Sequence, residues 1–163
     1  MAELTNLETK VAEVIGLAQA AQGATEKIEK LVDDDALKQT LQRMREEAVE
    51  TEERTTRVVE DFDGKKTAIL EKARETKQEA TEMMQTYLGS DADGLDGFEF
   101  LTMAEAGEVG HWEILGTLNE RARNTALGEV IEWATPIQQR HFEQARTGSL
   151  QLAAEEDPNE PAS

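Results

Sequence analysis

Apolar residues recur every three or four positions along most of this chain, which is the spacing of one face of an α-helix. The clearest run lies between residues 4 and 32, and others follow up to residue 146. Few β-branched residues alternate with polar ones, so strands are not indicated. Aromatic residues make up only 4% of the chain. The core must therefore be aliphatic and thin, which suits packed helices better than a β-sandwich.

The pattern predicts five helices, at about 4–32, 35–62, 65–88, 97–123 and 125–146. Asp33-Asp34-Asp35 supplies a turn and an N-cap, and Asp63-Gly64 interrupts the next run. Residues 89–97, GSDADGLDG, are expected to form a plain loop, because no glutamate closes a calcium loop there. The acidic, proline-bearing end predicts a disordered tail at 148–163, which leaves a single helical domain at 1–147.

The last two predicted helices are joined only by Asn124-Thr125, so they should be antiparallel neighbours. The first two form a similar pair, and the mostly polar segment 65–88 lies between the pairs. Two antiparallel pairs joined by a long crossover that contains an extra helix are the layout of a ferritin-like four-helix bundle. The predicted fold is therefore all-α and ferritin-like.

The net charge of −18, from 35 acidic and 17 basic residues, restricts the partners of this protein. Phosphate binding needs basic patches, so nucleic acid and anionic membranes are disfavoured. No apolar run is long enough to span a membrane, and no secretory signal is visible. These features predict a soluble, cytoplasmic protein. The acidic excess is read either as a solubility feature, including adaptation to a salty (halophilic) cytoplasm, or as a use of carboxylates to bind cations.

Both histidines of the chain are predicted to face the core. Glu108 and His111 share a helical arc with Leu101 and Leu115, and Glu-x-x-His is half of a di-metal site in four-helix carboxylate proteins. On the last helix, Gln138 and His141 join the apolar stripe. The two histidines are almost equally far from the Asn124 turn, so their levels differ by about 6 Å. They could share a cation or a hydrogen-bonded network.

The second helix adds Glu47 and Glu50 on the flank of its apolar stripe, and the first helix offers no inward glutamate. The chain has no cysteine, which excludes thiolate sites. Neutral Gln138 is a poorer ligand for hard cations than a carboxylate. The candidate metal ligands are Glu47, Glu50, Glu108, His111 and His141. The expected cofactor is iron, manganese or zinc. A protein that binds no metal is equally compatible with the sequence.

Three segments resemble the YciF-type family of ferritin-like stress proteins: ETEERTTRVVEDF at 50–62, GHWEILGTL at 110–118 and TPIQQRHFEQA at 135–145. That family carries His-x-x-Glu-Thr on its second helix, where Glu47 replaces the histidine here. It carries Glu-His-Tyr-Glu-Ile on its fourth helix, where Gly110 and Trp112 replace the first and third residues. Paired glutamates of the last helix correspond to Gln138-Gln139. The resemblance implies a ferritin-like bundle, often a homodimer, with a role in stress and a partly degenerate di-metal site.

Three functions remain open at this point. The first is metal binding, with or without weak oxidase or peroxide-scavenging activity, so the sequence does not decide whether the protein is an enzyme. The second is a non-catalytic scaffold or interaction protein that kept the bundle and lost the metal site. The third is a desiccation-type helical protein, because KARETKQEATEMM at 72–84 resembles late-embryogenesis-abundant repeats. This third function ranks last, because the apolar stripes elsewhere in the chain can bury a core.

Overall fold

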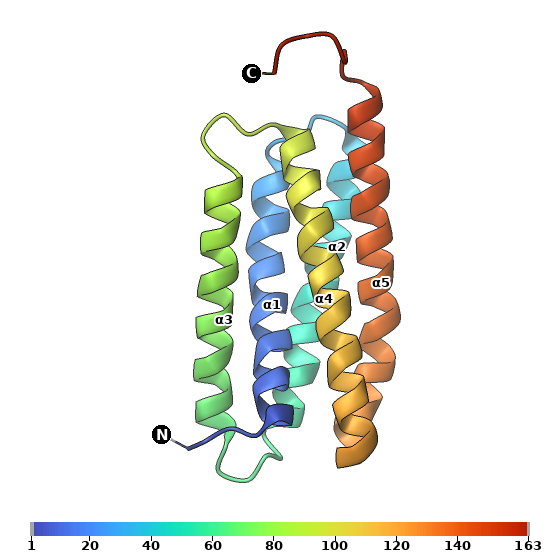
Figure 1. Ribbon diagram of the computed structural model, residues 1–163. Coiled ribbons are helices and arrows are strands. Elements are labelled where there is room, and N and C mark those ends of the chain that lie inside the picture. Colours follow the sequence, from blue (N-terminus) through green and yellow to red (C-terminus); the bar gives the residue numbers. More distant parts are fainter. Residues whose placement is uncertain (1, 163) are drawn as a thin grey trace.

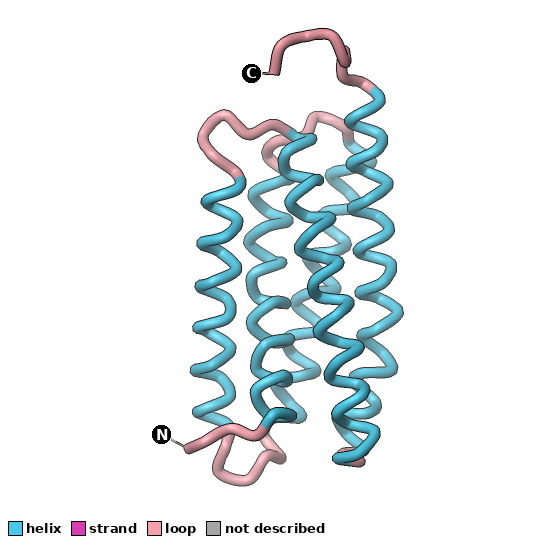
Figure 2. The backbone as a smooth tube through the Cα atoms, viewed as in Figure 1, coloured by secondary structure: helices cyan, strands magenta, loops and turns pink. Residues whose placement is uncertain are grey.

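Five helices account for most of residues 2–162, which are the residues that this computed structural model describes. They are α1 (Asn6–Glu29), α2 (Asp35–Val59), α3 (Lys66–Tyr87), α4 (Gly94–Ala122) and α5 (Thr125–Ala154), labelled in Figure 1. No strand occurs among the described residues, as Figure 2 shows. The prediction of an all-helical chain is confirmed.

Side chains at the N-caps fix where several helices begin. Asp34 accepts from the backbone N–H of Leu37, as the run of aspartates predicted, and Asn124 accepts from that of Leu127. Thr5 forms a capping box with Glu8 at the start of α1. These bonds satisfy backbone donors that have no partner within the helix.

Two predicted helix ends are wrong. Helix α4 begins at Gly94 and not near residue 97, because Asp93 and Asp96 form a second capping box. Helix α5 continues to Ala154 and does not end near Arg146. The Ser149 hydroxyl donates to the Phe98 carbonyl oxygen at 3.0 Å, so the extension is bonded to α4. The helical part of the chain thus includes 148–154, which the sequence had assigned to the tail.

Helices α1, α2, α4 and α5 surround a common core, and α3 lies along the outside of α1 (Figure 1). Helix α1 contacts α2, α3 and α4, while α5 contacts α4 and α2. Because α3 carries the chain back along the length of the bundle, α2 and α4 run in the same direction (Figure 1). The predicted extra helix is therefore present and is held by one face.

The apolar core consists of two separate clusters. One contains Val11, Ile15, Trp112 and Leu127, and the other contains Ile28, Leu41, Phe98 and Leu101, among other residues. Along each of α1, α2, α4 and α5, the residues of the two clusters are separated by two or more helical turns. Four buried polar side chains fall in this interval, Glu105 and Glu108 of α4 and Gln138 and His141 of α5. A polar layer thus divides the core at mid-height.

None of the helices within residues 2–162 combines the length and the apolar character that crossing a membrane requires.

The close contact of α1 with α3 gives a test of the fold. A Cβ at Gly16 would collide with the carbonyl oxygen of Ala73 and lie 2.7 Å from the Thr76 Cβ, whereas one at Gly23 would meet nothing within 4 Å. Overpacking costs about 1–3 kcal/mol, which exceeds the gain of about 1 kcal/mol from replacing a helical glycine by alanine. Gly16→Ala should therefore lower the free energy of unfolding, measured by urea denaturation.

Gly23→Ala is the matched control in the same helix and should raise the free energy of unfolding by up to about 1 kcal/mol. Equal stabilisation by both substitutions would contradict the tight α1–α3 contact.

Candidate functional site

The polar layer is formed by side chains of three helices. Helix α4 contributes Glu105 and Glu108, α5 contributes Gln138 and His141, and α2 contributes Glu47. Glu105 is 1% exposed and Glu108 is 6% exposed. Carboxyl groups are rarely buried to this extent without a basic partner. The layer is therefore the most unusual chemical environment in the described structure.

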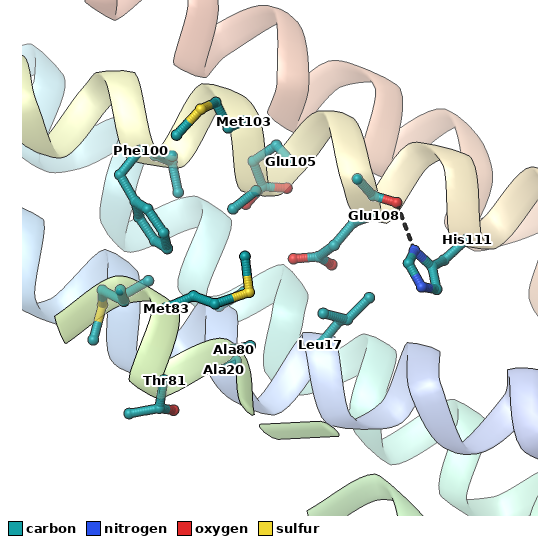
Figure 3. A pocket seen from close by; sticks show the side chains of 16 residues that line it. Leu17, Ala20, Ala80, Thr81, Met83, Phe100, Met103, Glu105, Glu108 and His111 are labelled. Carbon is teal, nitrogen blue, oxygen red and sulfur yellow. Dashed lines mark hydrogen bonds between the residues drawn. The ribbon is translucent and has the colours of Figure 1, made fainter. Parts of the chain in front are cut away.

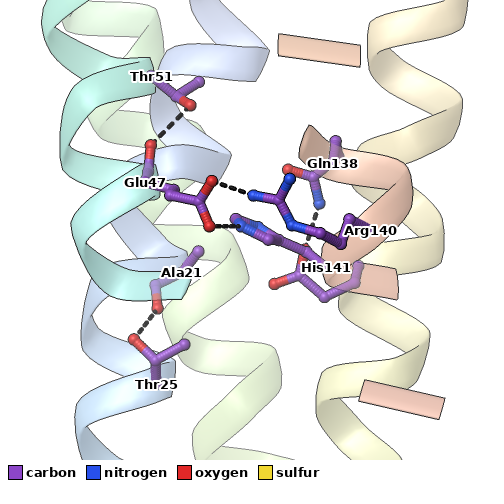
Figure 4. A network of polar contacts seen from close by, with 8 residues as sticks. Ala21, Thr25, Glu47, Thr51, Gln138, Arg140 and His141 are labelled. Carbon is purple, nitrogen blue, oxygen red and sulfur yellow. Dashed lines mark hydrogen bonds and ion pairs between the residues drawn. The ribbon is translucent and has the colours of Figure 1, made fainter. Parts of the chain in front are cut away.

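His141 lies between two carboxyl groups from different helices, and Figure 4 shows its bond to Glu47. Its Nε2 is 3.3 Å from Glu47 Oε1, and its Nδ1 is 3.9 Å from Glu105 Oε2. Arg140 also donates to Glu47, and Gln138 Nε2 donates to Glu105. These contacts join α2, α4 and α5 through one chain of polar groups.

Burial changes the protonation of this layer. It raises the pKa of Glu105 to about 7, although the hydrogen bond from Gln138 acts to lower this pKa. Burial and the neighbouring Glu105 raise the pKa of Glu108 well above its usual value. Burial also lowers the pKa of His141, despite its bond to Glu47. Burial opposes ionisation of Glu47 too, but hydrogen bonds from Arg140 and His141 outweigh it and lower the pKa of this carboxyl group.

The five predicted ligands do not converge. Glu47 and His141 meet, and Glu108 is buried nearby on α4. Glu50 lies outside the layer, where it pairs with Arg54 at 2.8 Å and is about half exposed. His111 is half-buried on the α1 side and does not face His141, because its Nδ1 lies 2.8 Å from the Gly107 carbonyl oxygen and its Nε2 3.5 Å from Glu13. The two histidines therefore bond to different groups, and the expected hydrogen-bonded network between them is not found among the described residues.

The sequence interpretation missed Glu105, the most buried acid of the chain. The predicted inward arc of α4 contains Leu101, Glu108, His111 and Leu115, but the buried positions also include Glu105, Trp112 and Asn119, whereas His111 is only half-buried. The centre of the arc is therefore rotated toward Trp112. The placement of Trp112, a large residue most stable when buried, was the available signal for this rotation.

The residues present do not fit a pair of metal ions. Helix α1 buries no acid, so the layer has no carboxylate from that side, and Gln138 stands where a second Glu-x-x-His would need glutamate. Within residues 2–162, no three carboxylate or imidazole groups are arranged to hold a metal ion.

A cavity of about 320 Å³ adjoins the polar layer (Figure 3). Ala20, Ala21 and Ala24 of α1 form its floor, and α3 and α4 form its walls. Its lining is mostly apolar, and Glu105, Glu108 and His111 are its ionisable groups. Figure 3 shows the Glu108 side chain pointing from α4 into this space. The cavity reaches the size at which small-molecule pockets begin.

Comparisons of the chain with protein-family models, with curated proteins and with solved structures gave no match. Function is therefore inferred from the residues and their geometry.

The raised pKa of Glu105 predicts a pH-dependent stability. The unfolded chain loses this proton near pH 4.5 and the folded protein near pH 7, so the stabilisation from the neutral acid is lost as the pH rises between these values. Glu105→Gln should therefore be more stable than the wild type at pH 8, by up to about 3 kcal/mol, and should match it near pH 4.5. Urea denaturation at both pH values measures the difference.

Glu50→Gln removes the same charge from an exposed pair and should change stability by less than about 1 kcal/mol at either pH. A Glu105→Gln protein that is destabilised at pH 8 would show that the carboxylate is needed in ionised form.

Proposed function

We propose that this protein is a ferritin-like helical bundle that acts as a non-catalytic binding protein, and that its core polar layer has a structural role. The ferritin-like assignment is supported by the crossover position of α3 and by the common direction of α2 and α4 (Figure 1). The stress-associated role and the homodimer implied by the YciF-type resemblance belong to the same proposal.

One observation carries the structural role: nearly every predicted metal ligand is already bound to another protein group. Glu47 is held by Arg140 and His141, Glu50 by Arg54, and His111 by Glu13 and the Gly107 carbonyl. A metal ion would have to displace these contacts and remove water from further acidic groups. On α5, the ligand that it would find beside His141 is the neutral amide of Gln138. Polar contacts that cross the core can instead fix the register of the helices, which is the best-attested use of buried polar groups.

Binding is favoured by the cavity beside this layer. Exposed Met83 and Met103 lie at its rim, with 67% and 53% of their surface accessible. Flexible methionine side chains adapt to ligands of different shape and are common on binding surfaces. An open apolar cavity with a few polar groups is the usual form of a small-molecule site.

The structural role predicts how His141→Ala behaves. Removing the ring deletes its bond to Glu47 and leaves a gap in the core, so the free energy of unfolding should fall by about 2 kcal/mol. The fall should be the same in chelator and after loading with iron, manganese or zinc, because no metal contributes to wild-type stability. His111→Ala, at a half-exposed site, should cost less than about 1 kcal/mol.

Elemental analysis of protein purified without chelator completes the test. The proposal expects far less than one metal ion per chain and an unchanged Tm after metal loading, since a ligand that binds the folded state raises Tm. Stoichiometric metal that is lost in His141→Ala would overturn the structural role and restore the metal-binding function.

A further inference from the structure

We propose that the cavity between α1, α3 and α4 binds an elongated apolar molecule that carries a single cationic head group, with the head group held by Glu108. This inference deepens the proposed function by naming the chemical class of the ligand, and it rests on that function.

Glu108 is the first observation behind the proposal. It is 6% exposed and faces the cavity, yet it has no hydrogen bond or ion pair within residues 2–162. Its neighbour Glu105, one turn earlier on α4, has Gln138 as a partner, and His141 is 3.9 Å away. The carboxyl oxygens of Glu108 are not among the completely buried atoms, so they can be reached from the cavity. Glu108 is thus available to a donor that enters the cavity.

The sign of the head group follows from the cavity walls. No lysine or arginine within the described chain lines the cavity, and two of its polar side chains are the acids Glu105 and Glu108. Two carboxyl groups one helical turn apart repel each other when ionised, and a cation beside them removes that repulsion. An ammonium group can donate to Glu108 in a charge-assisted hydrogen bond. An anionic head group would face the two acids instead.

The apolar part of the ligand follows from the shape of the cavity. Helix α3 packs tightly on α1 at Gly16, but the alanines of α1 one to two turns later leave space between α3 and α4. The remaining lining includes Leu17, Met84 and Phe100. A cavity of about 320 Å³ that is lined along α4 from Phe100 to His111 suits an alkyl chain better than a partner helix, which needs a longer groove.

Three probes with the same tail separate these features: decylammonium, decanol and decanoate. Methyl NMR of the methionines locates binding, because Met83, Met84 and Met103 line the cavity whereas Met44 lies in the core outside it. Titrations in about 1 M NaCl, where the Debye length is about 3 Å, suppress general attraction to the −18 charge. Decylammonium should shift only the three cavity methionines and bind at least about tenfold more tightly than decanol, with decanoate weakest.

Glu108→Gln should weaken decylammonium binding by about tenfold and leave decanol binding unchanged. Glu113→Gln removes the same charge from the exposed side of α4 and should alter neither. Ala80→Phe should block all three probes by filling the cavity, with an unchanged Met44 signal showing that the bundle remains folded.

Equal binding of decylammonium and decanol, or equal loss in the two glutamate variants, would overturn the cationic head group. No shift of the cavity methionines with any probe would overturn the site itself. Neither result bears on the structural role of His141, which the stability and metal measurements test separately.

Discussion

The packing of α1 against three other helices is the constraint on which the rest of the structure depends. A helix with neighbours on several sides must be apolar over most of its surface, and α1 buries Val11, Ala12, Val14, Ile15 and Gly16 almost without interruption. Gly16 lets α3 approach closely, and the alanines that follow leave the cavity between α3 and α4. The position of α3 and the presence of the cavity therefore both follow from the small side chains of α1.

The same arrangement explains why the polar layer lies toward α4 and α5. Helix α1 presents small and apolar groups at mid-height, and its buried Thr25 hydroxyl donates to its own helix, at the Ala21 carbonyl oxygen. Glu105 of α4 has its partners on α5, in Gln138 and His141, and His141 in turn contacts Glu47 of α2. Glu108 lies beyond the reach of these partners and faces the cavity instead.

Several elements could be predicted because their causes are local. The aspartates before α2, the Asp63-Gly64 break and the Asn124 junction act through caps and turns within a few residues. The length of α5 could not, since its C-terminal extension is bonded through Ser149 to Phe98 of α4, which is far away in sequence. The rotation of α4 is a similar case, as Ala104 and Glu105 compete for the core and only the neighbouring helices decide between them.

The sequence by itself determined that the chain is helical, where most helices begin, and that its surface is strongly acidic, because helical spacing, capping residues and net charge are local or additive properties. Only the tertiary structure decided which polar residues meet. It separated His111 from His141, turned Glu50 outward to Arg54 and brought Glu105 inward. The reason is physical: the rotation of each helix about its axis is set by packing against its neighbours, and a small rotation exchanges a solvated side chain for a buried one.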